Sequence, residues 1–302
     1  MTFPTHQPAM LLERLLPLLR DPVNKERLTA QRGVSGQATH IVSSHSTYEI
    51  SGGIPRMLVN EDTLVDAFGA RNVDAFLRLQ QAAEASYTVR TEGHFSSASF
   101  GPAVDYGMLL ARLERGLYLD VGCGLLAEPI YMRHARQLDF VGIDPMQIYV
   151  ERRFPFAQAY GDFLPFGASC FDGVLYSSTL DHVFNPQQAL EEGLRVLRPG
   201  GKLVIFTTIR PVDAAFERWQ RRAVFFATPY NTHHHWGFTA DLISDLLAEV
   251  GARIDVVEAT RHPQVVVVIG EKPRTEGEGA IESCSDSTPH GADDSPIPER
   301  FL

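Results

Sequence analysis

The sequence predicts an α/β protein with a seven-stranded, mostly parallel sheet that ends in an antiparallel hairpin, preceded by a small module. From residue 118 on, short apolar runs alternate with amphipathic stretches, which is the order of strands and helices in α/β folds. Several runs are apolar throughout, as expected for strands buried on both faces of a parallel sheet. Only the short stretch "TRHP" joins the last two runs, and so short a connection requires an antiparallel pair.

The expected strands read LYLDVG, DFVGID, FAQAYGD, FDGVLYSS, KLVIFTTI, RIDVVEA and QVVVVIGEK. Two of the intervening helices have recognisable ends. Asn185 can cap a helix that starts at Pro186, a position that favours proline. Thr239 can cap another helix, which Gly251 ends. The inward faces of these helices are expected to carry Leu190, Leu194 and Leu197, and Leu242, Leu246 and Val250.

Changes in composition divide the chain into segments. Residues 1–60 form a small unit, 61–117 a helical connection and lid, and 118–273 the main α/β domain. Within that domain, 208–238 lies between a strand and the next helix, and we interpret it as a substrate cover. The segment 274–302 is rich in Gly, Ser, Pro and acids, so it is expected to be a disordered acidic tail.

The composition is that of a globular protein without nucleic-acid or membrane partners. The chain has 302 residues, is 44% hydrophobic and carries a formal net charge of −10, without any block of Lys and Arg. It has no apolar run of 18 residues, and its start does not resemble a signal peptide. The three cysteines are odd in number and far apart, which argues against a disulfide framework and for a cytoplasmic location.

The loop "DVGCG" carries the strongest functional signal. Gly122 and Gly124 form a G-x-G after the first strand of the domain, a pattern shared by several nucleotide-binding folds. A pyrophosphate at such a loop needs positive field and bare N–H groups. Asp120 stands two residues before the first glycine and would repel a pyrophosphate. Its carboxylate suits a ligand with an ammonium and a sulfonium group, which S-adenosylmethionine (SAM) carries.

With this acid in place, D-V-G-C-G resembles the first motif of the Rossmann-like SAM-dependent methyltransferases, and the resemblance spans about 118–271. It implies that Asp120 lies by the methionine moiety and that Asp144, at the end of "FVGID", binds the ribose hydroxyls. "YGDFLPF" and the stretch from "FDGVLYSS" to the Pro-Gly-Gly turn resemble later motifs of the small-molecule branch. The family usually has a glycine at the position of Leu126. The cofactor-binding residues that the resemblance implies are Asp120, Gly122, Cys123, Gly124, Asp144, Pro145, Met146, Asp162, Phe163 and Ser177.

A nicotinamide cofactor is the alternative at the same loop, because those enzymes also place an acid where Asp144 stands. The combination of Asp120 with the later motifs favours SAM.

The N-terminal unit resembles a zinc-ribbon-like module that often precedes methyltransferase domains, and also the activator subunit of tRNA and protein methyltransferases. The resemblance covers about 40 residues, from "DPVNKERL" to "YEISGGIPRML". Structural zinc needs four thiolate or imidazole ligands. The positions where the family has cysteines are occupied by Asp21, Asn24, Ile41 and Ser44, and His40 and His45 are too few to replace them. We therefore expect the scaffold without a metal.

Two histidines are candidates for a general base, because methyl transfer often needs one group to take a proton from the acceptor. His182 follows the fourth strand, and His235 precedes the helix capped by Thr239. The adjacent histidines of "HHH" point in different directions, so they do not indicate a metal site. The aromatic residues expected to line the substrate cover are Phe216, Trp219, Phe226, Tyr230 and Trp236.

The sequence therefore predicts a cytoplasmic SAM-dependent methyltransferase that modifies oxygen or nitrogen of a small molecule and that can form a homo-oligomer. The alternatives are an RNA or protein methyltransferase and a non-catalytic SAM-binding scaffold or partner subunit. The absent basic patch and zinc ligands weigh against the first, and the presence of Asp120, Asp144 and Asp162 weighs against the second.

Overall fold

A computed structural model describes residues 8–89, 101–146, 151–209, 235–262 and 264–274. Its main body is a seven-stranded sheet in the order β10-β11-β9-β8-β5-β6-β7. The strands are β5 (Gly116–Val121), β6 (Leu138–Asp144), β7 (Phe156–Gln158), β8 (Phe171–Ser177), β9 (Leu197–Thr208), β10 (Arg253–Ala259) and β11 (Val265–Glu271). Five are parallel, whereas β11 runs antiparallel to both β9 and β10. The predicted fold class, including the terminal hairpin, is confirmed.

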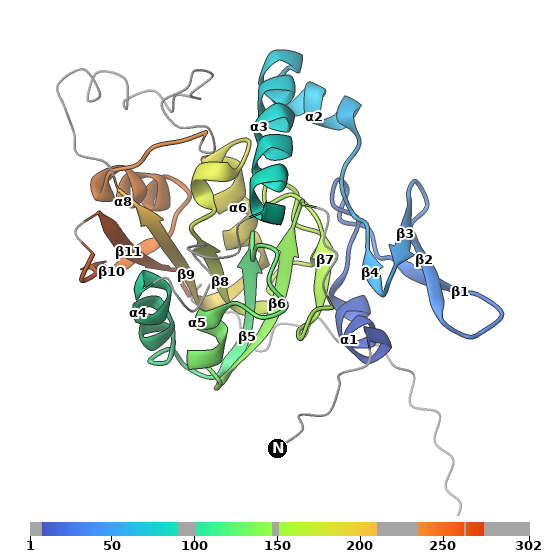
Figure 1. Cartoon of the computed structure of the whole chain (residues 1–302), viewed down its shortest axis with the longest axis horizontal. Coiled ribbons are helices and arrows are strands. Elements are labelled where there is room, and N and C mark those ends of the chain that lie inside the picture. Colours follow the sequence, from blue (N-terminus) through green and yellow to red (C-terminus); the bar gives the residue numbers. More distant parts are fainter. Residues whose placement is uncertain (1–7, 90–100, 147–150, 210–234, 263, 275–302) are drawn as a thin grey trace, which may run out of the picture.

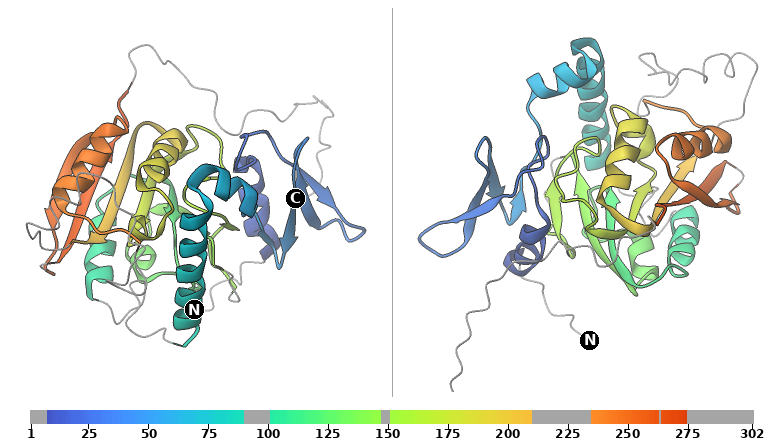
Figure 2. Two further views of the ribbon diagram at one scale, coloured as in Figure 1. Left: turned by 90° about the horizontal axis from the view of Figure 1, so that it is seen from above. Right: turned by 180° about the vertical axis from the view of Figure 1, so that it is seen from behind.

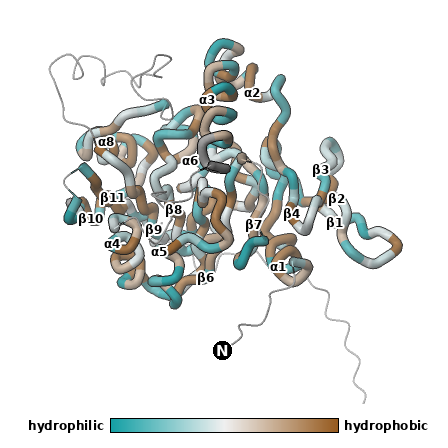
Figure 3. Tube along the Cα trace, in the orientation of Figure 1, coloured by the Kyte–Doolittle hydropathy of each residue, from teal (hydrophilic) through white to brown (hydrophobic). Residues whose placement is uncertain are grey.

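Helices cover both faces of this sheet, as Figures 1 and 2 show. On one face lie α4 (Gly101–Leu110) and α5 (Ile130–His134), which share a core cluster with Tyr118, Leu175 and Phe206. On the other lie α6 (Pro186–Val196), α8 (Ala240–Glu249) and α1 (Pro8–Leu15), which pack with Leu119, Val174 and others. Hydrophobic segments recur along the strands and in α1 (brown in Figure 3). Neighbouring strand residues pack on opposite faces: Tyr118 and Leu175 on the first, Leu119 and Val174 on the second. This is the two-residue period of a strand.

The predicted helix ends are confirmed. The side chain of Asn185 accepts hydrogen bonds from Gln187 and Gln188, and Pro186 opens α6. The side chain of Thr239 accepts from the N–H of Leu242, and Gly251 has a φ of 86°.

Two strands differ from their predicted extents. β7 has three residues instead of the seven of FAQAYGD, because the chain turns after Gln158 and the N–H of Phe163 closes onto the carbonyl of Tyr160. β9 begins at Leu197, ahead of the Pro-Gly-Gly stretch that was expected as a turn, so Leu197 belongs to the strand and not to the helix face. A register shift between Phe171 and Gly173 lets this stretch pair with β8.

The N-terminal unit is a separate four-stranded antiparallel sheet of β1 (Thr29–Arg32), β2 (Ala38–Val42), β3 (Thr47–Ser51) and β4 (Ile54–Pro55). It lies beside β7 (Figure 1). Arg56, just after β4, forms a parallel bridge with Gln158 of β7, so backbone hydrogen bonds link the small sheet to the edge of the large one. A 3₁₀ turn (Leu16–Leu18) connects α1 to this unit.

Two further helices stand above the carboxyl ends of the parallel strands (Figure 1). They are α2 (Glu61–Phe68), which the side chain of Asn60 caps, and the 20-residue α3 (Ala70–Val89). No helix in the described part of the chain is long and apolar enough to cross a membrane. Cys123 is a free, buried thiol.

Candidate functional site

The polar residues predicted to bind the cofactor gather at one edge of the sheet. Asp120 lies near the end of β5, Asp144 ends β6, Asp162 follows β7 and Ser177 ends β8. These four strands are neighbours and parallel, so their carboxyl ends meet at the same edge. In open α/β sheets, ligands bind in the crevice outside this edge, where the strand order reverses. Here the order reverses at β5, because β6 and β8 lie on opposite sides of it.

Asp120 is fully buried among hydroxyl groups. Its Oδ2 accepts a 2.7 Å hydrogen bond from the hydroxyl of Tyr131, and its Oδ1 accepts a 2.9 Å bond from Ser177. The Ser177 hydroxyl also lies 3.2 Å from that of Tyr106 on α4. Burial raises the pKa of Asp120 to about 7, although both hydrogen bonds oppose this shift. A cation near Asp120 would favour its ionised form.

Asp144 fastens the glycine loop to the end of β6. Its Oδ2 accepts a 2.9 Å hydrogen bond from the N–H of Gly124, and its Oδ1 accepts a 2.9 Å bond from the N–H of Met146. The N–H groups of Gly122 and Cys123 donate to the carbonyl of Ile143 at 2.8 and 3.1 Å. Three successive N–H groups of the loop are therefore used inside the protein. A phosphate-binding loop needs these groups free, so this loop lacks the donors of an anion cradle.

Backbone conformation and packing explain the two glycines of this loop. Gly122 has a φ of 73°, and a Cβ there would lie 2.1 Å from Cγ2 of Thr179. The hydroxyl of Thr179 in turn donates to the carbonyl of Gly122 at 3.1 Å. Gly124 has a φ of 71°. Leu126, where the related family has a glycine, does not have a positive φ, so the loop conformation does not require a glycine at that position.

Arg152 is a structural part of the site that the sequence analysis missed. It is 5% exposed, and its guanidinium donates to the carbonyls of Gly124 and Leu126. The guanidinium lies 4.5 Å from the centre of the Phe156 ring, close enough for a cation–π contact. Its charge also opposes the rise that burial causes in the pKa of Asp144. The signal available in the sequence was the stretch ERRFPF, in which two adjacent arginines precede β7 and its phenylalanine, and this pattern is too common to single out.

Asp162 and Phe163 occupy the turn that follows β7. The carboxylate of Asp162 accepts the N–H of Asn185 at 2.7 Å and that of Phe184 at 3.1 Å, at the start of α6. Burial raises the pKa of Asp162 to about 7, against the effect of these hydrogen bonds. Phe163 is half-buried and meets Phe68 of α2 edge-on at 5.8 Å. Asp162 therefore shapes the loop around it, and its contact with a cofactor stays a prediction.

The two candidate bases have different surroundings. The side chain of His182 is 26% exposed, and its Nε2 lies 3.8 Å from Oδ1 of Asp181. His235 is 2% exposed, and its ring stacks on Phe76 of α3 at 4.6 Å. Its backbone N–H donates to the carbonyl of Asp181 at 2.9 Å. Both histidines thus lie around Asp181, just beyond the carboxyl end of β8.

An aromatic cluster attaches α2 and α3 to the core next to these histidines. Phe184 stacks on Phe76 at 3.6 Å and on Phe68 at 4.8 Å, and Tyr160 meets Phe184 edge-on at 5.4 Å. This attachment places α3 over the candidate cofactor edge, where Glu84 of α3 contributes to the raised pKa of Asp144 and of Tyr160.

Most of the predicted substrate cover lies outside the described residues, including Phe216, Trp219, Phe226 and Tyr230. Trp236 is described: it is 9% exposed, and its indole N–H donates to the carbonyl of Val183 at 2.8 Å. The predicted acidic tail also lies outside the described residues, except for Arg274. Within the described ranges, no three His, Cys, Asp or Glu side chains are placed to hold a metal ion.

Comparisons with known proteins agree with this geometry. Residues 119–205 match the family described as "Methyltransferase domain". An O-methyltransferase of Penicillium expansum is 31% identical over 171 residues, which are 51% of this chain and 58% of that protein. The demethylmenaquinone methyltransferase of Mycobacterium tuberculosis is 41% identical over 66 residues, 22% of this chain and 28% of that protein. The chain thus spans less than two thirds of the length of these relatives.

Among solved structures, a 1,6-didemethyltoxoflavin-N1-methyltransferase of Burkholderia thailandensis with bound S-adenosylhomocysteine aligns with 14% identity and a TM-score of 0.47. The alignment covers 77% of this chain and 98% of that chain. Residues 119–205, which run from β5 into β9, thus match a methyltransferase domain.

Proposed function

We propose that the chain is a SAM-dependent methyltransferase that transfers a methyl group to oxygen or nitrogen of a small molecule. The observation that carries the proposal is the chemistry of the glycine loop. Its N–H groups at Gly122, Cys123 and Gly124 are all used internally, and the buried carboxyls of Asp120 and Asp144 lie beside it. Such an edge repels a pyrophosphate and attracts a cationic ligand.

The residues at this edge fit the parts of SAM. Asp120 would face the charged methionine end, and the remaining lone pairs of Asp144 would accept the ribose hydroxyls. Met146 and Phe163 would line the adenine, beside Asp162. When bound, SAM supplies a methyl group that is activated by its sulfonium. The protein then has to hold the acceptor in line with that methyl and exclude water.

Of the two histidines, the surroundings favour His182 as the group that takes the proton of the acceptor. A base must touch the acceptor, and the side chain of His182 is partly exposed and lies near the carboxylate of Asp181. His235 is buried and stacked on Phe76, which suits a residue that orients the loop. His182→Ala is expected to lower turnover and leave SAM affinity intact, whereas His235→Ala is expected to lower both turnover and SAM affinity.

The relatives support a small acceptor. Their names describe an O-methyltransferase and a demethylmenaquinone methyltransferase, and the net charge of −10 is unfavourable for a nucleic-acid substrate.

The N-terminal sheet fits a ribbon-like module without metal. Asp21 stands where the related modules have a cysteine, and its Oδ1 accepts the N–H groups of Val23 and Asn24 at 2.9 and 3.1 Å. Its Oδ2 accepts the hydroxyls of Tyr48 at 3.0 Å and Ser43 at 3.4 Å. A buried carboxylate thus joins the two halves of the module by hydrogen bonds.

The test is calorimetric titration of the purified protein with SAM and, separately, with S-adenosylhomocysteine. We expect micromolar or tighter binding of both, and its loss in Asp144→Ala, which removes the acceptor for Gly124 and for the ribose. Binding then justifies a screen of phenolic, quinol and amine acceptors for methyl transfer. If neither ligand binds the wild-type protein, the proposal is wrong.

A further inference from the structure

The N-terminal module contacts the segment that follows Asp162 along its backbone. Leu19 forms an antiparallel bridge with Phe166. The N–H of Arg20 donates to the carbonyl of Pro165 at 2.9 Å, and the N–H of Gly167 donates to the carbonyl of Leu18 at 3.3 Å. The segment 164–167 is therefore bordered on one side by residues from the start of the chain.

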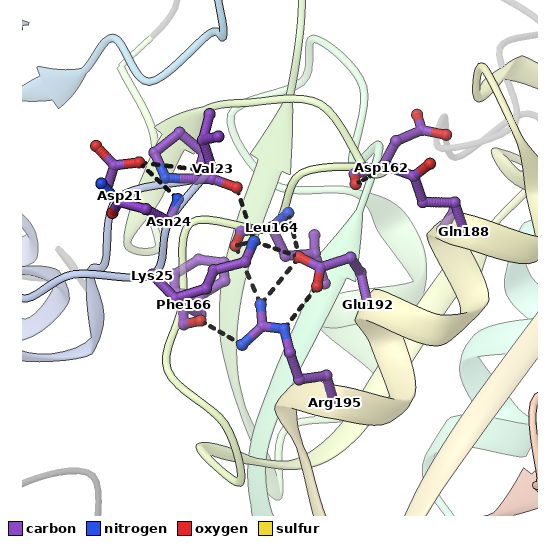
Figure 4. A network of polar contacts seen from close by, with 12 residues as sticks. Asp21, Val23, Asn24, Lys25, Asp162, Leu164, Phe166, Gln188, Glu192 and Arg195 are labelled. Atoms are coloured by element: carbon purple, nitrogen blue, oxygen red, sulfur yellow. Dashed lines mark hydrogen bonds and ion pairs between the residues drawn. The ribbon is translucent and has the colours of Figure 1, made fainter. Parts of the chain in front are cut away.

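Lys25 of the same module adds a charged contact, shown in Figure 4. Its ammonium donates to Glu192 Oε2 of α6 at 2.7 Å, to the carbonyl of Pro22 at 2.7 Å and to the carbonyl of Leu164 at 3.2 Å. An ammonium has three N–H donors, so all three are used. The side chains of Lys25 and Glu192 are 28% and 14% exposed. This contact is therefore better shielded from solvent than an ordinary surface ion pair.

The same carboxylate and its neighbour hold the segment from the other side (Figure 4). Glu192 Oε2 accepts the N–H of Leu164 at 3.0 Å. Arg195 pairs with Glu192 at 2.6 Å and donates to the carbonyls of Phe166 at 2.8 Å and Leu164 at 3.2 Å. Lys25, Glu192 and Arg195 thus share one polar network centred on the backbone of Leu164.

The network is continuous with the candidate cofactor residues. Two residues before Leu164, the carbonyl of Asp162 accepts from Gln188 Nε2 of α6 at 3.1 Å, and its carboxylate accepts the two N–H groups at the start of that helix. The turn with Asp162 and Phe163 is therefore fixed to α6 before and after Phe163. On the far side of the turn, Lys25 supplies part of the attachment.

A second route leads from the module to the other side of the same site. Arg56 Nη1 donates to Gln158 Oε1 at 3.0 Å, and Gln158 Nε2 donates to the carbonyl of Pro145 at 2.9 Å. Pro145 follows Asp144 directly. The module thus contacts the segment that follows Asp162 and Phe163 directly, and it reaches the segment of Pro145 and Met146 through Gln158.

We propose that the N-terminal module is a working part of the cofactor site, in which Lys25 and Arg56 are positioning residues. Lys25 holds the turn at Asp162 and Phe163 through Leu164 and Glu192, and Arg56 holds Pro145 through Gln158. This inference rests on the proposed function, because the ligand that these segments would bind is the adenosine part of SAM.

The experiment measures binding of S-adenosylhomocysteine by calorimetry to the full chain and to Lys25→Met, Arg56→Met and Lys25→Arg. We expect each methionine variant to bind about fivefold to tenfold more weakly, with part of the loss recovered in Lys25→Arg, which keeps the charge and N–H donors. Adenosine alone should show the same fold-loss as S-adenosylhomocysteine, because the affected segments face only that part of the ligand.

Lys202→Met is the matched control. The side chain of Lys202 is also 28% exposed, and it pairs with Glu271 at 2.6 Å and Asp255 at 2.8 Å. It lies on β9 opposite Gly173, near the amino end of β8 and far from the cofactor edge. Its loss should leave ligand affinity unchanged.

Hydrogen exchange gives a readout that general destabilisation would not produce. In Lys25→Met, the amides of 164–167 should exchange faster, while those of β5 and β6 keep the wild-type rate. The inference is overturned if both methionine variants bind as tightly as the wild type, or if Lys202→Met weakens binding as much as they do. If the wild type itself binds neither ligand, the proposed function is what fails.

Discussion

The hydroxyl of Ser177 donates a 2.9 Å hydrogen bond to Oδ1 of Asp120, so the ends of β8 and β5 are joined through a buried carboxyl group. Burial raises the pKa of this carboxyl to about 7, whereas the pKa of an unfolded aspartate is about 3.9. The folded protein therefore binds the proton more tightly than the unfolded chain. Stability from this group is complete below about pH 4 and is lost as the pH rises towards about 7.

Asp120→Asn should remove this pH dependence, because the amide does not titrate and the hydroxyls of Tyr131 and Ser177 can rotate to suit it. In the wild type, the group lowers the free energy of unfolding by up to about 1.4 kcal/mol per pH unit within that window. Urea unfolding at pH 5, 6, 7 and 8 measures the difference between the two proteins. An equal slope in both would mean that Asp120 is ionised throughout.

Arg152→Met should destabilise the protein by about 3 to 5 kcal/mol, because it leaves buried carbonyls and acids without their cation. Arg153→Met is the control next to it. Its side chain is 62% exposed and pairs with Glu128 at 3.6 Å, so its loss should cost under ~1 kcal/mol. Urea unfolding at pH 7 compares the two variants, and similar losses would contradict a special role for Arg152.

Gly122→Ala should prevent the loop from keeping its conformation for two reasons. The new Cβ would lie 2.1 Å from Thr179, and the alanine would have to adopt a positive φ. Gly36→Ala separates these effects, because Gly36 has a φ of 77° with nothing within 4 Å. We expect Gly36→Ala to lower the free energy of unfolding by about 1 to 2 kcal/mol, from the left-handed conformation alone. Gly122→Ala should lose clearly more stability, together with binding of S-adenosylhomocysteine. Equal thermal shifts in the two variants would show that Thr179 moves aside.

Phe76→Ala should lower the free energy of unfolding by about 3 to 5 kcal/mol, because the ring is buried and stacks with both Phe184 and His235. Phe76→Leu keeps most of the volume and should cost under about 1.5 kcal/mol. If the cluster attaches α3 to the core, hydrogen exchange in α3 should rise strongly in the first variant and weakly in the second. Unchanged exchange in both would place the attachment of α3 elsewhere.

The fold was predictable from the sequence because its signals are local. Apolar runs such as that of β11, the caps at Asn185 and Thr239 and the short hairpin connection each depend on neighbouring residues. The same holds for the placement of Asp120 and Asp144 at strand ends.

The roles of these acids depend on contacts between distant residues, which no local pattern reveals. Asp144 was predicted to bind ribose hydroxyls, and in the structure it also accepts a hydrogen bond from the N–H of Gly124, 20 residues away. Arg152 was not predicted for the same reason, because the carbonyls that it binds, those of Gly124 and Leu126, belong to another segment. β7 ends early because of a local turn, in which the N–H of Phe163 closes onto the carbonyl of Tyr160, and the residues of FAQAYGD did not indicate this turn.

The bridge between Arg56 and Gln158 has a practical consequence for anyone who trims the protein. β7 is the last strand of the large sheet, and residues from the start of the chain cover its outer side. Removal of residues 1–60 would expose a row of unpaired backbone groups, which favours association between copies of the chain. Expression of the α/β domain alone should therefore yield aggregates, although its sequence boundary near residue 118 looks suitable for cloning.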